Sequence, residues 1–376
     1  MSDGRPRRGY LDVLRGLAVL IMIESHLLDS WTRFPDRQTW RFAYAMVLGG
    51  FGAPLFLFLA GVAVPLSAGS KFRRTGDVNA ASRAVVRRGL EIFGLAFLFR
   101  LQSWVLGWSS PRYLLKVDIL NIMGPSIMAA AAIWGALRTA KGRFAAFAAA
   151  TLAVTLLTPI VRNVSLLSPL PDAIEAYLRP VGGLSNFVFF PWAGFVFAGA
   201  IVGLVLDAIQ TRRQEHLANL GFALVGTAVA VTAYDLSFRP SWYSQSHFWT
   251  TSPEFFFMRV GIMTAAIALA YLWELRPGGA HRWSPLQQLG RTSLFIYWIH
   301  VEIVYGLVSL PLHKRLSWAQ SWVALAVFCF LMLLCSIYKD RVVRRWTAQG
   351  SGLRSSGPPR RGVVKDDVVG RPGPAI

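Results

Sequence analysis

Residues 10–31 read YLDVLRGLAVLIMIESHLLDSW. This run is long enough to cross a bilayer as a helix. It nevertheless carries five ionisable side chains: Asp12, Arg15, Glu24, His26 and Asp29. An ionisable group at the centre of a bilayer costs about 2.5–3.5 kcal/mol on insertion scales. A span that keeps such groups turns them toward a protein interior or a water-filled cavity, so this stretch predicts a polar site inside a membrane protein.

The spacing of these side chains places most of them on one face of a helix. Intervals of three or four residues separate Asp12, Arg15, Val19, Met22, His26 and Asp29, whereas Glu24 lies off this face. Asp12 and Arg15 have an equally good alternative, in which they cap the helix near the headgroups and pair with each other. For His26, deep in the run, a functional role is favoured over a hydrogen bond to a neighbouring helix.

The whole chain has the composition of a membrane protein. Of its 376 residues 54% are hydrophobic and only 15% are charged, whereas soluble domains carry about 25% charged residues. The sequence therefore predicts an all-α, polytopic transmembrane helix bundle of about ten spans. The expected spans are 11–31, 42–68, 89–108, 118–137, 144–161, 183–206, 217–235, 254–275, 289–311 and 318–338, with a loop in the second at Gly49, Gly50 and Gly52.

Lysine and arginine concentrate in alternate loops, notably in residues 71–88 and from residue 339 onward. This bias predicts that both termini are cytoplasmic, which requires an even number of spans. We therefore expect a cytoplasmic N-terminus over residues 1–10, a membrane domain over 11–338, and a basic, disordered cytoplasmic tail over 339–376. The net charge of +20 then points to the anionic inner leaflet, and no nucleic-acid partner is expected.

A second concentration of polar side chains lies in the ninth expected span, LGRTSLFIYWIHVEIVYG, residues 289–306. Ser293, Tyr297 and His300 share one helix face, and Arg291 lies at its inner end. Tyr297 and His300 could line the same cavity as His26. Equally, they could be interhelical hydrogen-bonding groups with a structural role only.

Asp118 and Asn121 form a third concentration, one helical turn apart at the start of the fourth expected span. For Asp118 alone, a helix N-cap is the favoured interpretation. The glycines of residues 49–64 favour close helix packing over a channel wall. Cys329 and Cys335 do not face each other on a helix, and no metal site is expected.

Four motifs resemble the heparan-α-glucosaminide N-acetyltransferase-like family of bacterial membrane proteins, which is similar to the wider group of transmembrane acyltransferases. They are Asp12–x–x–Arg15–Gly16 with Met22 and His26, GAPLFLFLAG at 52–61, VDILNIMG at 117–124 and SLFIYWIH at 293–300. The resemblance implies a multi-pass protein of the bacterial cytoplasmic membrane. It would take an acyl group, in the first place acetyl, from cytoplasmic acetyl-CoA or another acyl-CoA. The acceptor would be an amine or hydroxyl of an extracytoplasmic sugar or cell-envelope polymer.

The eukaryotic members that act on heparan place a catalytic histidine in the loop after the first span. Here that loop offers Asp29, Asp36 and Arg37 and no histidine, which argues against heparan as acceptor and transfers the acid–base role to His26. Asp29, three residues on, would orient the His26 ring and raise its basicity. A histidine in a dry cavity can take the proton that a nucleophile loses as it attacks a thioester.

The hypothesis assigns a role to each of these polar residues. The catalytic residues are expected to be His26, Asp29, Tyr297 and His300; the acyl-CoA contacts Asp12, Arg15, Arg291 and Ser293; and the acceptor contacts Asp118 and Asn121. The partners are the lipid bilayer, acyl-CoA and the acceptor, and a homodimer is left open. Two alternatives remain: a proton-coupled transporter or exporter, and a membrane protein whose polar faces only hold helices together.

Overall fold

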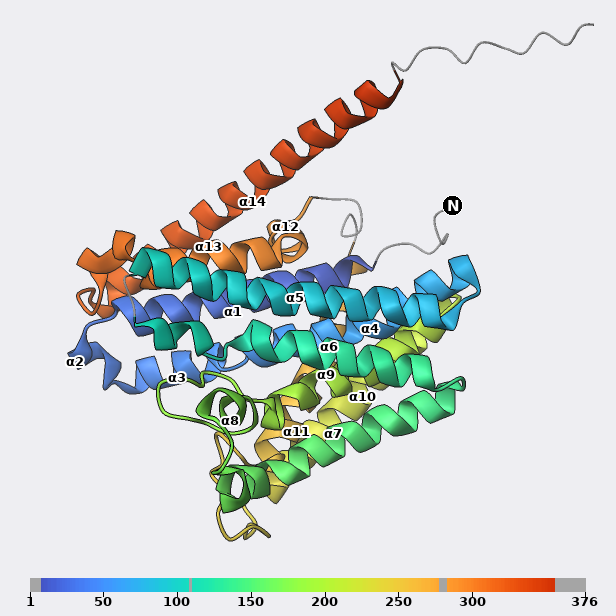
Figure 1. The fold of residues 1–376 in the computed structure, drawn as a ribbon, viewed down its shortest axis with the longest axis horizontal. Coiled ribbons are helices and arrows are strands. Elements are labelled where there is room, and N and C mark those ends of the chain that lie inside the picture. Colours follow the sequence, from blue (N-terminus) through green and yellow to red (C-terminus); the bar gives the residue numbers. More distant parts are fainter. Residues whose placement is uncertain (1–7, 108–109, 277–282, 356–376) are drawn as a thin grey trace, which may run out of the picture. The chain divides into compact units, whose positions relative to one another are not determined.

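The computed structural model describes residues 8–107, 110–276 and 283–355 of the chain. The chain divides into two compact units, residues 1–336 and 337–376. Within the described residues the regular secondary structure is helical and no strand occurs, which confirms the all-α prediction (Figure 1). Residues 356–376 of the expected disordered tail, and residues 1–7 of the expected cytoplasmic N-terminus, lie outside the described residues.

The long helices are α1 (Gly9–Trp31), α4 (Gly52–Thr75), α5 (Val78–Gly107), α6 (Ile119–Ala136), α7 (Ala140–Asn163), α9 (Phe189–Ala208), α10 (Arg212–Leu236), α11 (Pro253–Glu274) and α14 (Trp318–Ser355). The shorter helices are α2 (Phe34–Arg37), α3 (Trp40–Gly49), α8 (Asp172–Leu178), α12 (Pro285–Arg291) and α13 (Ser293–Tyr305). Three 3₁₀ segments connect them: η1 (Pro111–Leu115), η2 (Ser165–Leu167) and η3 (Leu307–Leu312).

Seven helical segments of the described chain are long and apolar enough to cross a membrane, with α3 and α4 counted together. The sequence predicted ten. The other three expected spans correspond to α1 and α5, which carry charged side chains within their apolar runs, and to α13, which has 13 residues. These three helices carry most of the polar site described below. The count of ten and the cytoplasmic location of both termini remain predictions.

The ninth expected span is not one helix. It breaks at Thr292, whose φ of −107° and ψ of 15° separate α12 from α13. The hydroxyl of Thr292 lies 3.1 Å from the carbonyl oxygen of Gln288 and 2.6 Å from the hydroxyl of Ser336, so the side chain competes for local backbone groups. The expected loop at Gly49–Gly52 is present, because α3 ends at Gly49 and α4 begins at Gly52.

The last helix is longer than the expected span, which ended at residue 338. It continues to Ser355 through KDRVVRRW, a segment of residues that tolerate a helix well and that contains no proline. The part of α14 beyond Ser336 belongs to the second compact unit and is described here by itself. Residues 339–355 of the expected disordered tail are therefore helical.

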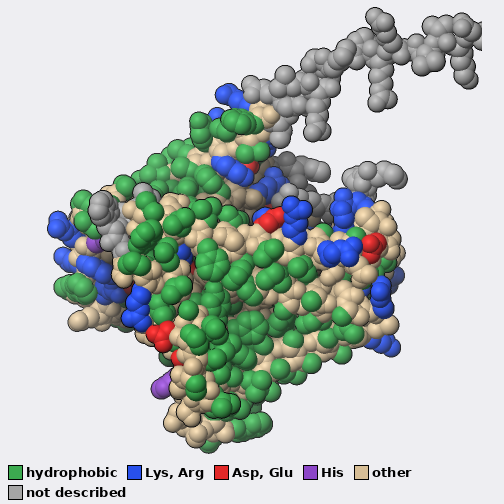
Figure 2. Space-filling model, in the orientation of Figure 1, with side chains coloured by type: hydrophobic (Ala, Val, Ile, Leu, Met, Phe, Trp, Pro, Cys, Tyr) green, Lys and Arg blue, Asp and Glu red, His purple; other side chains and the backbone are tan. Residues whose placement is uncertain are grey.

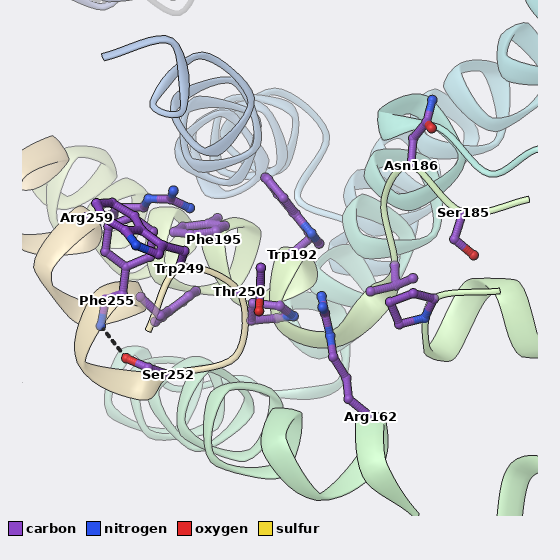
Figure 3. A pocket seen from close by; sticks show the side chains of 14 residues that line it. Arg162, Ser185, Asn186, Trp192, Phe195, Trp249, Thr250, Ser252, Phe255 and Arg259 are labelled. Atoms are coloured by element: carbon purple, nitrogen blue, oxygen red, sulfur yellow. Dashed lines mark hydrogen bonds between the residues drawn. The ribbon is translucent and has the colours of Figure 1, made fainter. Parts of the chain in front are cut away.

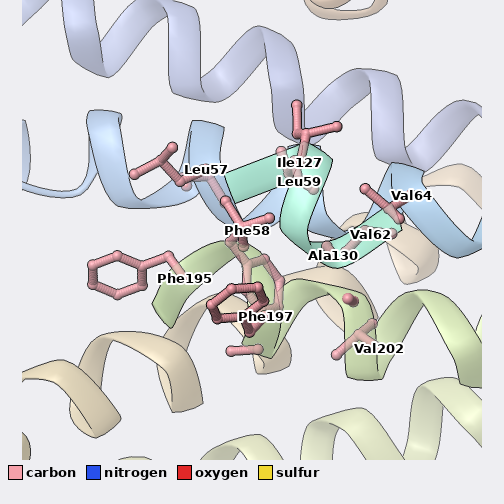
Figure 4. Packing of buried hydrophobic residues seen from close by; sticks show 14 of the residues in the cluster. Leu57, Phe58, Leu59, Val62, Val64, Ile127, Ala130, Phe195, Phe197 and Val202 are labelled. Atoms are coloured by element: carbon pink, nitrogen blue, oxygen red, sulfur yellow. The ribbon is translucent and has the colours of Figure 1, made fainter. Parts of the chain in front are cut away.

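The first unit is built on helices whose backbones touch. A Cβ atom on Gly61 of α4 would lie 2.0 Å from the carbonyl oxygen of Val196, and one on Gly199 of α9 would lie 1.9 Å from that of Phe58. Inside a bilayer, lipid tails are as apolar as leucine, so close packing of this kind supplies much of the association energy between helices. The buried apolar side chains of α4, α6 and α9 interdigitate around this contact (Figure 4).

A similar contact joins the first helix to α12. A Cβ atom on Gly16 would lie 2.0 Å from the carbonyl oxygen of Leu286, and one on Gly290 would lie 1.9 Å from that of Asp12. Only glycine fits at either point, because any side chain would collide with main-chain atoms. The two contacts fix the N-terminal half of α1 against α12.

The surface has a pattern suited to a bilayer. On the face shown in Figure 2, apolar side chains cover the middle of the helices, and lysine and arginine gather near both ends. Large apolar side chains such as Leu152, Leu156 and Ile160 on α7 are exposed. The exposed surface of the first unit is therefore the kind expected of an integral membrane protein.

Candidate active site

Two histidines from distant parts of the chain meet in the structure. Nδ1 of His26 on α1 lies 3.0 Å from Nε2 of His300 on α13, and the two rings stack with their planes 6° apart. His300 is fully buried, whereas His26 is partly exposed. The two polar helix faces that the sequence marked are therefore turned toward each other, and only His26 of the pair is open to a substrate.

The hydrogen bonds assign the tautomers of this pair. Nδ1 of His300 lies 2.8 Å from the carbonyl oxygen of Ile296, which only accepts, so this nitrogen carries a proton. In neutral His300 the remaining nitrogen, Nε2, must then accept, and Nδ1 of His26 donates to it. Neutral His26 is left with an unprotonated Nε2. That lone pair is the form of imidazole that acts as a base.

A buried ion pair lies beside the histidines. One guanidinium nitrogen of Arg100 on α5 donates to Oδ2 of Asp118 at 2.7 Å, and the hydroxyl of Tyr297 donates to the same oxygen at 3.2 Å. The Arg100 and Asp118 side chains are 4% and 14% exposed. The Tyr297 ring contacts the His300 ring at a centroid distance of 5.9 Å, which connects the ion pair to the histidine pair.

The expected N-cap of the fourth span is present. Oδ1 of Asp118 accepts from the amide of Ile119 at 2.9 Å, and Oδ1 of Asn121 accepts from the amide of Asp118 at 3.0 Å. The Asp118 side chain also accepts from the backbone amide of Asn121, and together with the bond from the Asp118 amide to Asn121 this forms a capping box. Asp118 thus caps α6 with one oxygen and holds Arg100 and Tyr297 with the other.

Asn121 also reaches across to a loop helix. Its Nδ2 donates to the hydroxyl of Tyr177 on α8 at 3.2 Å. Burial raises the pKa of Tyr177, and the bond from Asn121 acts in the opposite direction. The Tyr177 hydroxyl therefore stays protonated at neutral pH, and its own hydrogen remains available for a further acceptor.

Asp29 does not make the expected contact with His26. Its Oδ1 accepts from Arg37 of α2 at 2.7 Å, and its carbonyl oxygen accepts from Arg37 and from Lys314. The Arg37 guanidinium therefore takes the Asp29 carboxylate in place of the neutral imidazole one turn away. The partner that orients the His26 ring is therefore His300.

Near the N-terminal end of the same helix, two arginines converge on one carboxylate. Asp12, which is 1% exposed, lies 3.2 Å from Arg15 and 3.6 Å from Arg291. The Arg15 and Arg291 side chains are 30% and 44% exposed, so both guanidiniums can also meet a ligand from solvent. Ser293 begins α13 two residues after Arg291. Asp12 contacts both Arg15 and Arg291, so three of the four residues expected to contact acyl-CoA meet in the structure.

Two participants were missed from the sequence. Arg100 lies within the expected span 89–108 and was assigned no role from the sequence, although a charged residue in a span is itself a sign of a buried partner. Tyr305 packs edge-on against His26 at a centroid distance of 5.5 Å, and no periodic pattern marked it. Within the described residues, no group of three or more potential metal ligands occurs.

A comparison with protein families identifies the family of this chain. The sequence profile of the family described as Heparan-alpha-glucosaminide N-acetyltransferase, catalytic, matches residues 7–232, which is more than half of the chain. No curated protein matches the chain. The matched segment contains His26, Arg100 and Asp118, and His300 lies beyond it.

Proposed function

Because this chain belongs to the heparan-α-glucosaminide N-acetyltransferase catalytic family, we propose that it moves an acyl group from cytoplasmic acyl-CoA to an extracytoplasmic acceptor. The family itself assigns it to the membrane acetyltransferases. The finer proposal is acetyl-CoA as donor and an amine or hydroxyl of a saccharide or envelope polymer as acceptor. The protein would act as a multi-pass protein of the bacterial cytoplasmic membrane.

The histidine pair is the observation that carries this proposal. An amine or hydroxyl must lose a proton as it attacks the thioester carbonyl, and Nε2 of His26 is the free lone pair to take it. The carbon–sulfur bond then breaks, and the thiolate of CoA leaves and takes up a proton. His300, which holds Nδ1 of His26, stabilises the imidazolium that forms and fixes the direction of the reactive nitrogen.

The other site residues support the pair. Tyr297 donates to Asp118 and touches the His300 ring, so we assign it the role of a positioning residue. Asp118 and Asn121 are the proposed acceptor contacts, because they begin α6 next to Tyr297. Asp29, paired with Arg37, contributes a negative charge near His26 without touching its ring.

The donor would bind at the inner end of α1. Arg15 and Arg291 carry exposed guanidiniums, the group best suited to phosphate oxygens, and Asp12 holds the two together. Ser293 adds a hydroxyl at the start of α13. From Arg15 to His26 is a rise of about 16 Å along the helix, so the donor must extend along α1 to reach the base.

The test uses the full chain, purified and placed in lipid nanodiscs. Acetyl-CoA is titrated by calorimetry, and release of free CoA is followed with and without a glucosamine-type acceptor. We expect wild type to bind and turn over, and His26→Ala to bind with turnover at least about 100-fold lower. His247→Ala is the matched control, because His247 is an exposed loop histidine.

Absence of binding by acetyl-CoA and longer acyl-CoA, in protein that unfolds cooperatively, contradicts the acyltransferase proposal. It would favour the alternative of a proton-coupled transporter, which is then tested as pH-driven uptake in liposomes. Equal turnover by wild type and His26→Ala would leave the family activity in place and remove His26 as its base.

A further inference from the structure

A second polar pocket lies away from the histidine pair. Its volume is about 160 Å³, and it opens between the end of α7, the start of α9 and the start of α11 (Figure 3). The residues that line it and enter the argument are Arg162, Trp192, Trp249, Thr250, Phe255 and Arg259. A cavity of about 150 Å³ in another protein holds a benzene molecule, so this space suits one six-membered ring or a group of that size.

Two guanidiniums from different helices line this pocket. Arg162, near the end of α7, donates from Nε and one terminal nitrogen to the carbonyl oxygen of Phe190 at 3.3 and 3.1 Å. Arg259 on α11 stacks over the Phe255 ring at 3.7 Å. Figure 3 shows the two arginines on either side of Trp192. Each guanidinium has five N–H donors, so both retain donors for a ligand.

The charge of this pocket is not balanced by carboxylates. Among the lining residues that the structure describes there is no aspartate or glutamate, and neither arginine forms an ion pair within the described chain. Nε of Arg259 is buried and has no hydrogen-bond partner among the described residues. A buried donor without an acceptor is destabilising, and more so when it is charged. A bound oxyanion would supply the Arg259 guanidinium with the counter-charge that the described residues do not.

The pocket wall is joined to the candidate active site through the backbone. The amide of Val117 donates to the carbonyl oxygen of Leu184 at 2.7 Å, and the amide of Asn186 donates to that of Val117 at 3.0 Å. Asn186 lines the pocket, and Val117 precedes Asp118. The turn between α3 and α4 contacts both α1 and the pocket, because a Cβ atom on Gly49 would lie 2.5 Å from the Ser25 side chain and one on Gly50 would lie 3.4 Å from a guanidinium nitrogen of Arg259. Neither His26 nor His300 lines the pocket.

We propose that this pocket is an oxyanion-binding site distinct from the histidine site, and that it takes a carboxylate or phosphate carried on a single ring or on a group of similar size. The two guanidiniums bind the anion, and the rings of Trp192 and Trp249 pack on the attached group. A free acidic sugar and the headgroup of an anionic lipid share this chemistry. The proposal does not depend on the acyltransferase function.

The first arm of the test uses the full chain in phosphatidylcholine nanodiscs, titrated with glucuronate, glucose 1-phosphate and uncharged glucose. We expect saturable binding of one or both charged sugars, at least tenfold weaker in Arg259→Gln and in Arg162→Gln, and weaker in high salt. Arg239→Gln is the matched control, because Arg239 pairs with Asp235 on an exposed surface.

The second arm uses native mass spectrometry on protein taken from membranes containing phosphatidylglycerol. If a lipid headgroup occupies the pocket, wild type should retain phosphatidylglycerol and Arg259→Gln should lose it. The bound lipid should then block binding of glucuronate. Either source supports the site. Binding of glucose as strong as that of the charged sugars overturns the proposal, and so does the absence of both acid-sugar binding and lipid retention.

A further variant guards against misfolding of the arginine variants. Thr250→Trp fills the pocket from a loop, where the fold tolerates a larger side chain, and it leaves both guanidiniums in place. We expect it to abolish binding of the charged sugars while acetyl-CoA binding stays at the wild-type level. Retention of charged-sugar binding in folded Thr250→Trp would contradict the assignment of the site to this pocket.

Discussion

Arg100 and Asp118 form an ion pair at 2.7 Å, with the arginine side chain 4% exposed, and the same carboxylate oxygen accepts from Tyr297. A buried pair of this kind contributes little net stability, because each ion loses its hydration. Removing one partner is a different matter, because the other charge is then left alone in a medium of low dielectric constant. The pair therefore fixes how α5, α6 and α13 meet.

Asp118→Asn is expected to destabilise the protein by about 3–5 kcal/mol, because it leaves Arg100 buried without a counter-charge. Asp172→Asn is the matched control. It breaks the ion pair between Arg112 and Asp172, whose side chains are 72% and 59% exposed, respectively. This change should cost no more than about 1 kcal/mol of stability. Thermal unfolding in the same detergent compares the two variants. Equal losses would show that the buried pair has no special structural role.

His26 and His300 are expected to act as one unit. His300→Ala should lower kcat by at least about tenfold, because the His26 ring loses its orienting partner, and His26→Ala should lower it by about 100-fold or more. In the double variant the effects should not add, since His300 has no role once the base is gone. A double-mutant cycle on kcat measures this coupling. Strictly additive effects would separate the two histidines.

Arg15→Gln and Arg291→Gln are each expected to raise KM for acetyl-CoA by about tenfold with little change in kcat, because phosphate contacts act on binding. Each single variant leaves Asp12 with the other arginine, which preserves the fold. Arg112→Gln, at the other end of the helices, serves as control. A fall in kcat at unchanged KM would show that these arginines act on the chemical step instead.

Gly61→Ala is expected to destabilise the first unit strongly, because the added methyl would lie 2.0 Å from the carbonyl oxygen of Val196 and α4 would have to leave α9. Gly94→Ala on α5 is the control, since no atom lies within 4 Å of its Cβ position. That change should be neutral or stabilising, because alanine favours a helix more than glycine. Unfolding temperatures of the two variants give the comparison, and similar values would refute the close contact.

Asp36 links the loop after α1 to the start of α14. Its Oδ2 accepts from Arg33 at 2.6 Å and from the amide of Trp318 at 3.0 Å, and these bonds hold its pKa below the usual 3.8. Stability from a carboxylate with a lowered pKa is complete above its unfolded value and is lost as pH falls through its folded value. Wild type should therefore unfold at a higher temperature than Asp36→Asn at pH 6, and the difference should disappear below the folded pKa. A difference that does not shrink as the pH falls below 3.8 would contradict this.

Periodicity alone identified the helix faces that carry His26 and His300, because ionisable groups in apolar runs are costly enough to be informative. It could not identify which faces meet. Asp29 is the clearest case: one turn from His26, it pairs instead with Arg37, a residue of the following loop. Side-chain partners across a loop depend on tertiary geometry, which spacing along one helix does not contain.

The helix boundaries show the same limit. The loop at Gly49–Gly52 could be predicted, since glycines interrupt an apolar run there. The break at Thr292 could not, because it depends on Ser336, 44 residues away. The sequence shows Arg100 as a charged residue in an expected span, but it does not show its partner. Asp118 was explained as an N-cap, and in the structure it both caps α6 and pairs with Arg100.

The glycine contacts between α1 and α12 have a consequence for the donor end. Since Gly16 and Gly290 bring main chain against main chain, the anchor points of Arg15 and Arg291 are set by the backbone and not by side-chain rotamers. The backbones that carry the two arginines cannot move apart without losing this contact. Any adjustment to a ligand proposed to bind there must therefore come from the arginine side chains, which are 30% and 44% exposed.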